Sequence, residues 1–235
     1  MGKNASELVL FGHPFSSYCQ KVLIALRENP IPFELRLFGG DERIWAELAA
    51  LWPIRRMPVL VDRGRPIMEA SIIIEHLGLH HPGPVHLIPA DPGAALDARL
   101  MDRFFDNYIM TPVQKIVGDC LRPAERRDAH GVIEARALLD KAYAWLEDTL
   151  KGREWAAGGA FSLADCAAAP SLFYADWVHE IPAAFDCSRG RQSRKRWTKR
   201  GPTGTSFRPA RPTGTELTRP SAVACSGRCG SAIPR

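Results

Sequence analysis

The sequence contains no apolar run that approaches the roughly 18 to 20 residues needed for a membrane-spanning helix. The segment MGKNASELVLFGHP at residues 1–14 lacks the basic and then apolar pattern of a secretory signal. The six cysteines form no CxxC pair, so no disulfide framework is predicted. We therefore expect reduced thiols and a cytoplasmic location, with no membrane partner.

Acidic residues are nearly absent from residues 187–235, where 12 Lys and Arg face one acidic residue. Residues 1–186 contain more acidic than basic residues, so the formal charge of +5 is the sum over two segments of opposite net charge. The tail is rich in Arg, Gly, Pro, Thr and Ser, and it shows neither helical nor strand periodicity. A disordered basic tail is predicted.

The abrupt change near residue 187 has two explanations. A shifted reading frame would replace a native C-terminus with Arg- and Pro-rich text, and an apolar helical continuation in another frame of the gene would support it. The rival hypothesis is an evolved basic arm that contacts nucleic acid. We favour the frameshift, because aromatic residues for base stacking are nearly absent from the tail.

Residues 1–79 show a mixed pattern of short apolar runs and amphipathic runs. Strands are predicted at 8–11, 33–37, 59–61 and 65–67, and helices are predicted near 20–29, 41–51 and 70–79. The predicted order is βαβαββα, so the fold class of this region is α/β. Residues 80–93 are rich in proline and histidine and read as a linker.

Residues 94–186 show only helical periodicity. Leu96, Leu100, Phe104 and Tyr108 recur at i+4 in one predicted helix, and residues 132–150 and 161–178 supply two more. An all-α domain is therefore expected to follow the α/β domain.

Three histidines fall in the predicted linker, and none of them is expected to bind a metal. Among themselves, His80, His81 and His86 form no helical i, i+4 pair, and acidic neighbours at ligand spacing are lacking. No metal is predicted.

Polar side chains cluster where the first predicted strand meets the first predicted helix. Ser16 and Ser17 stand at this helix start, where free backbone N–H groups and the helix dipole favour a negative charge. A serine hydroxyl there can donate a hydrogen bond to a bound thiolate, or it can simply cap the helix. Cys19 is interpreted as a small packing residue.

Four motifs occur in order: PFSSYCQKVLIAL, LWPIRRMPVL, EASIIIEHL and FSLADCAAAPSL. With the βαβαββα order they resemble the cytosolic glutathione S-transferases over residues 8–186. The resemblance implies a thioredoxin-like domain at 1–79 that binds glutathione, and a helical domain at 94–186, incomplete at its end, that completes a pocket for an electrophile. It also implies a homodimer.

The resemblance assigns residues to the glutathione site. The catalytic serine of the serine-type classes falls on Ser16, with Ser17 as the alternative. Arg56 falls on a lysine that binds the glycyl carboxylate, Met57 on the residue whose backbone pairs with the cysteinyl peptide, and Pro58 on a cis-proline. Arg55 and Arg56 also fit a solvated loop pair.

The third and fourth motifs extend this assignment. Glu69 would hold the γ-glutamyl ammonium, whereas Ala70 replaces a common serine, so that Ser71 or backbone N–H groups would have to bind the neighbouring carboxylate. The implied structural residues are Ser162 and Asp165, which form a capping box. Phe104 and Tyr108 are weaker candidates for the electrophile pocket, since such spacing is more often core.

The sequence-based hypothesis is a glutathione S-transferase that conjugates the thiolate of glutathione, as co-substrate, to a small electrophile. The alternative is a binding or regulatory protein that keeps the fold without turnover. Peroxidase, isomerase and dehalogenase uses of glutathione stay open.

Overall fold

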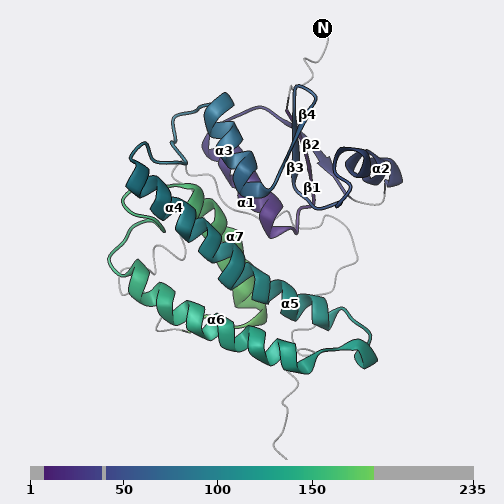
Figure 1. The fold of residues 1–235 in the computed structure, drawn as a ribbon, viewed down its shortest axis with the longest axis vertical. Coiled ribbons are helices and arrows are strands. Elements are labelled where there is room, and N and C mark those ends of the chain that lie inside the picture. The colour runs from purple at the N-terminus through teal and green to yellow at the C-terminus, as the bar shows by residue number, and fades with distance from the viewer. Residues whose placement is uncertain (1–7, 39–40, 183–235) are drawn as a thin grey trace, which may run out of the picture.

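The computed structural model describes residues 8–38 and 41–182, and these residues form an α/β unit followed by a helical unit (Figure 1). The basic tail at 187–235, with the frameshift and nucleic-acid hypotheses attached to it, lies outside the described residues. Among the described helices, none is long and apolar enough to cross a membrane.

The first unit follows the predicted βαβαββα order, which is confirmed. Its elements are β1 (Leu8–Gly12), α1 (Ser17–Glu28), β2 (Glu34–Leu37), α2 (Glu42–Leu51), β3 (Val59–Asp62), β4 (Arg65–Met68) and α3 (Ala70–His80).

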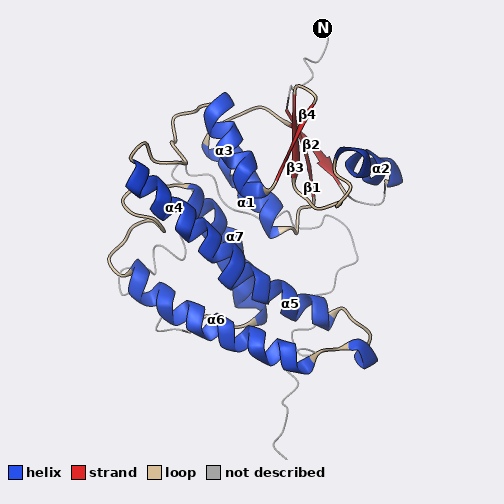
Figure 2. Ribbon diagram, viewed as in Figure 1, coloured by secondary structure: helices blue, strands red, loops and turns tan. Residues whose placement is uncertain are grey.

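The four strands form one mixed sheet in the order β2-β1-β3-β4. β1 and β2 are parallel, while β3 is antiparallel to both β1 and β4. Figure 2 shows α1 and α3 on one face of the sheet and α2 on the other. Apolar side chains of the strands pack against α1 and α3 on the first face, and Leu48 of α2 packs with Phe11 and Val59 on the second. This arrangement is the thioredoxin-like fold.

The second unit is entirely helical, as predicted. It consists of α4 (Pro92–Phe104), a π-helical segment η1 (Phe105–Met110), α5 (Thr111–Cys120), a short 3₁₀ turn η2 (Ala124–Arg126), α6 (Ala129–Leu150) and α7 (Leu163–Val178).

The π-helical segment joins α4 to α5, a helix that the sequence analysis did not predict. Pro112 has no N–H to continue the regular ladder, and its ring disfavours the preceding helical turn. The backbone N–H and the hydroxyl of Thr111 both donate to the carbonyl of Asp106, an i to i−5 pattern that widens the helix. The widened turn lets the chain continue through Pro112 as a helix.

The i+4 stripe predicted along α4 faces outward over most of its length. Leu96 and Leu100 are 67% and 57% exposed, whereas Ala98, Met101 and Phe105 on the opposite side enter the core. The stripe was predicted from large apolar side chains alone, whereas the face that enters the core contains small residues such as alanine.

The two units share one interface, in which α7 packs against α1. Leu163 and Cys166 of α7 are fully buried with the side chains of α1 and the sheet. The predicted capping box at the start of α7 is present: the Asp165 carboxylate accepts from the Ser162 N–H at 2.9 Å and from the Ala156 N–H at 2.8 Å. Burial raises the pKa of Asp165 to about 6, although these hydrogen bonds oppose the rise.

Candidate functional site

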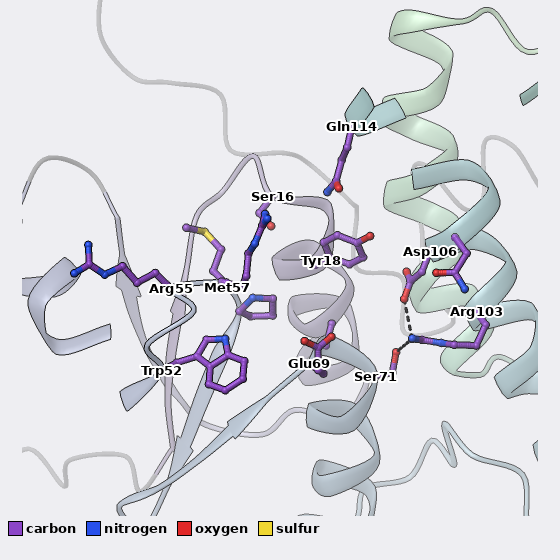
Figure 3. Close-up of a pocket in the computed structure, with 14 residues that line it drawn as sticks. Ser16, Tyr18, Trp52, Arg55, Met57, Glu69, Ser71, Arg103, Asp106 and Gln114 are labelled. Atoms are coloured by element: carbon purple, nitrogen blue, oxygen red, sulfur yellow. Dashed lines mark hydrogen bonds and ion pairs between the residues drawn. The ribbon is translucent and has the colours of Figure 1, made fainter. Parts of the chain in front are cut away.

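A cleft of about 470 Å³ opens between the α/β unit and the helical unit (Figure 3). It receives side chains from the start of α1, the loop before β3, the start of α3 and the helical stretch from α4 to α5. Its lining residues are Ser16, Tyr18, Trp52, Arg55, Arg56, Met57, Pro58, Glu69, Ala70, Ser71, Arg103, Asp106, Asn107 and Gln114. Most of the residues predicted from the sequence therefore meet in one cavity.

Ser16 lies in this cleft at the N-cap of α1. Its backbone is extended, and its Oγ accepts a hydrogen bond from the Cys19 N–H at 3.3 Å. The same side chain also hydrogen-bonds the Cys19 thiol and lowers its pKa, so the hydroxyl is a donor that can exchange the buried sulfur for a ligand atom in the cleft. Ser17, the predicted alternative, is 6% exposed and is not among the lining residues.

Cys19 is buried beneath the same helix turn. Burial raises the pKa of its thiol, and the His13 N–H donates to its sulfur at 3.4 Å. Because nucleophilic cysteines need a lowered pKa, the structure agrees with a packing role for this residue.

The loop before β3 supplies a second wall. The peptide bond between Met57 and Pro58 is cis, which confirms the sequence prediction for Pro58. Arg56 and Met57 line the cleft as the resemblance implies, and Trp52 and Arg55 join them. Figure 3 shows the Met57 and Trp52 side chains on the same side of the cleft as Ser16.

Glu69 occupies the N-cap position of α3 with an unusual backbone. Its φ of 67° lies in the left-handed region, which costs a residue other than glycine of order 1–3 kcal/mol. Its side chain makes no capping bond to α3, and it lines the cleft. A carboxylate kept at the cavity at a conformational cost is suited to a cationic ligand group.

Ser71 lies one residue beyond the position where Ala70 replaces the expected serine. Its hydroxyl donates to the Asp102 carboxylate at 2.8 Å and accepts from the Lys21 ammonium at 2.9 Å. The single hydroxyl proton of Ser71 is thus already used. The backbone N–H groups at the start of α3 are therefore better candidates than Ser71 for binding a ligand carboxylate.

A group of four charged residues next to Ser71 connects the two units. Lys21 of α1 is 1% exposed and forms ion pairs with Asp102 and, at 2.8 Å, Asp106. Arg103 also pairs with both carboxylates, at 2.7 and 2.8 Å, and contacts Ser71. We call these four residues the interdomain charge cluster; two cations balance two anions within it.

Tyr18 is a cleft residue that the sequence analysis did not name. Burial, followed by the negative charge of Asp106, raises the pKa of its hydroxyl to about 12. The phenol therefore stays protonated at neutral pH and can donate a hydrogen bond into the cleft. The sequence signal for this residue is the tyrosine of the segment SSYC, which directly follows the two serines.

Arg103, Asp106, Asn107 and Gln114 were also missed, because they come from the helical unit, far from the first three motifs in sequence. The two residues proposed for the electrophile pocket lie elsewhere. Phe104 stacks on Trp145 with ring centroids 4.2 Å apart, Tyr108 is 49% exposed, and neither lines this cleft.

Together the lining residues can bind a zwitterionic ligand. The helix starts at Ser16 and Ala70 favour anionic groups, the arginines attract carboxylates, and Glu69 attracts an ammonium. A thiolate beside Ser16 would meet both a hydroxyl donor and the positive end of α1.

Two family models match the chain. Residues 10–85 match the N-terminal domain of glutathione S-transferases, and residues 122–200 match the C-terminal domain. Similar curated proteins include glutathione S-transferase U7 of Arabidopsis thaliana, 30% identical over 76% of this chain and 74% of that protein. FtsZ-localized protein A of Caulobacter vibrioides is also 30% identical, over 86% of this chain and 90% of that protein.

A solved structure supports the same comparison. A glutathione S-transferase of Methylobacterium radiotolerans in complex with glutathione sulfonate superposes with a TM-score of 0.67. It is 26% identical, and the match covers 90% of this chain and 99% of that one.

Proposed function

Because the chain belongs to the glutathione S-transferase family, we propose that it conjugates the thiolate of glutathione to a small electrophile, with Ser16 stabilising the thiolate. One observation carries the proposal: Ser16 caps α1 and lines the cleft, so that its hydroxyl and the positive end of the helix lie together at the ligand site.

The energy required is within reach of this arrangement. A thiol with a pKa of roughly 8.5 must lose about two pKa units to be mostly ionised at pH 7, which takes about 2.7 kcal/mol. A hydrogen bond to a charged group supplies roughly 1.5–3 kcal/mol, and a helix dipole adds about 0.3–1 kcal/mol. No general base is needed.

The rest of glutathione fits the remaining groups of the cleft. The backbone of Met57 pairs with the cysteinyl peptide, and Arg56 binds the glycyl carboxylate. Glu69 binds the γ-glutamyl ammonium, and the N–H groups at Ala70 bind the adjacent carboxylate. In the proposed complex Ser71 acts indirectly, by fixing the start of α3 to the interdomain charge cluster.

Replacing Ser16 with alanine is expected to lower kcat/KM by about 10- to 100-fold, because one hydrogen bond to the thiolate is lost. The measurement is the ultraviolet thiolate band of bound glutathione at pH 7, together with turnover of a chloronitroaromatic electrophile. Ser17→Ala is the matched control, since Ser17 is buried outside the cleft, and Tyr18→Phe tests the neighbouring phenol. An undiminished band in Ser16→Ala would refute the role of Ser16.

A second candidate function, binding without turnover, has its own supporting observation. Ala70 removes a hydroxyl from the ligand site, and Ser71 is committed to Asp102. One relative of 30% identity is named for its localisation with FtsZ rather than for a transferase activity. Glutathione-dependent thermal stabilisation with neither a thiolate band nor turnover, in wild type and Ser16→Ala alike, would favour this function.

We also propose a homodimer formed through the outer faces of α3 and α4. Leu96 and Leu100 are exposed on α4, and Ile72 and Leu79 of α3 are 54% and 77% exposed. Leu79 shares a helix face with Glu75, which pairs with Arg99 of α4, so the apolar side chains adjoin one another. A second copy of the chain would cover them.

Changing both Leu96 and Leu100 to glutamate is expected to convert the dimer to a monomer, because four charges would be buried at the two-fold interface. Light scattering after size-exclusion chromatography measures the mass directly. Leu121→Glu is the matched control, since Leu121 is 81% exposed at the end of α5, away from this face. An unchanged mass in the double variant would contradict the assignment of the interface.

A further inference from the structure

Three potential metal ligands meet at the end of α3 that is remote from the cleft. Asp62 ends β3, His76 lies on α3, and His81 is the residue that caps its C-terminus. The Nε2 atoms of both histidines lie 2.8 Å from Oδ2 of Asp62. The interpretation of His81 as a linker residue without an acidic neighbour was wrong, because the fold brings β3 to it.

The donor set of this cluster matches a transition metal. One ligand atom from each residue lies within 4.8 Å of the others. Two imidazole nitrogens and one carboxylate oxygen are the usual ligands of Zn²⁺, whereas Mg²⁺ and Ca²⁺ prefer oxygen ligands. This set of ligand atoms therefore favours Zn²⁺ over Mg²⁺ and Ca²⁺.

A second observation points to a ligand. The Asp62 side chain is 9% exposed, and its Oδ1 is buried without a hydrogen-bond partner among residues 8–38 and 41–182. A buried, unsatisfied carboxylate oxygen normally costs roughly 1–3 kcal/mol. The histidine side chains are 12% and 18% exposed, so the cluster is accessible from solvent along their side.

We propose that Asp62, His76 and His81 form a binding site for Zn²⁺, with water as the fourth ligand. Each Nε2 must present its lone pair, so the ring proton lies on Nδ1 in the metal-bound form. Metal–ligand distances of about 2.0–2.2 Å separate tetrahedral ligand atoms by roughly 3.3 Å. Since the present separations from Oδ2 are 2.8 Å, a shift well below 1 Å opens the site.

The position of the site assigns it a structural role. Ala70 at one end of α3 borders the cleft, while the ten residue steps from Ala70 to His80 place the other end of the helix about 15 Å away. A metal bound to β3 and to both His76 and His81 fastens the C-terminal end of α3 to the β-hairpin. Its binding is therefore measurable without any transferase assay.

The test is titration of the metal-free full-length protein with Zn²⁺, followed by calorimetry and by thermal unfolding. We expect the cluster to bind one Zn²⁺ per chain. The melting temperature should rise by roughly 5–10 °C when the concentration of free Zn²⁺ is 100 times the dissociation constant. Co²⁺ alone, added to the same protein, should give the visible absorption of a site with nitrogen ligands.

Two variants test whether the histidines of the cluster bind the metal. His76→Gln and His81→Gln should each weaken Zn²⁺ binding by at least tenfold while the metal-free far-ultraviolet circular dichroism stays unchanged. His130→Gln is the matched control, because His130 is an exposed histidine 3.5 Å from Glu134 and lies outside the cluster. A full-length variant with Cys225→Ser and Cys229→Ser controls for thiol ligands. Absence of Zn²⁺ binding, or affinity equal in His76→Gln, His81→Gln and wild type, would overturn the proposal.

Discussion

Replacing Lys21 with methionine is expected to lower the free energy of unfolding by about 3–5 kcal/mol, because removing one partner of a buried ion pair strands the other. Lys21 is almost fully buried between Asp102 and Asp106, and Arg103 alone cannot neutralise both carboxylates. For a chain of this size the melting temperature should fall by roughly 6–20 °C. Urea unfolding gives the free energy, and a calorimetric scan gives the temperature.

Two comparisons make this prediction specific. Arg43→Met removes an ion pair with Asp41 whose Arg side chain is 88% exposed, and we expect no measurable change. The double variant Lys21→Met with Asp102→Asn should recover part of the loss, since one stranded charge is removed as well. A Lys21→Met variant as stable as wild type would show that the interdomain charge cluster contributes nothing to folding.

The loss should also depend on pH. Burial raises the pKa of Asp106, and the charge of Lys21 opposes this rise, so the pKa climbs further in Lys21→Met. A carboxyl whose pKa is higher in the folded state binds more protons when folded, and stability then rises as pH falls through that pKa. The gap between Lys21→Met and wild type should therefore narrow from pH 7.5 to pH 5.

Replacing Asp165 with alanine is expected to cost about 2–5 kcal/mol, because the buried N–H groups of Ala156 and Ser162 lose their acceptor together. Asp165 is 2% exposed, so water cannot replace the carboxylate. The measurement is urea unfolding at pH 7.5, with Asp165→Asn expected to lie between the alanine variant and wild type because it keeps one acceptor oxygen.

The matched control is Asp91→Ala. Asp91 caps α4 through a bond from the Ala94 N–H at 2.8 Å, but it is exposed, and losing such a cap typically costs about 1 kcal/mol. The contrast separates an ordinary helix cap from the buried anchor at Asp165. Equal losses in the two alanine variants would contradict the anchoring role.

Local patterns predicted the parts of this molecule that local physics determines. The alternating and helical periods predicted the βαβαββα order, and the segment FSLADC predicted the capping box of α7. Both features arise from residues that are close in sequence. The order of the motifs predicted the fold. That fold places four of the predicted site residues in the same cleft: Ser16, Arg56, Met57 and Glu69.

Long-range contacts account for what the sequence did not predict. Lys21 has the same pattern as any lysine on an amphipathic helix, and only the docking of α4 and η1 shows that it is buried between two carboxylates. Asp62 and the two histidines lie on different elements, so no spacing rule joins them. The helix α5 was missed because Pro112 normally ends a helix, whereas a π-helical turn absorbs it here.

The interdomain charge cluster also limits how this chain exchanges parts in evolution or in the laboratory. Recombination anywhere between residues 81 and 91 separates Lys21 and Ser71 from Asp102 and Asp106. A chimaera would inherit a buried ammonium from one parent, and it would need two carboxylates at matching helix positions from the other. The compatible donors are therefore those that have both acids at the positions of Asp102 in α4 and Asp106 in η1, whatever electrophile their helical domains accept.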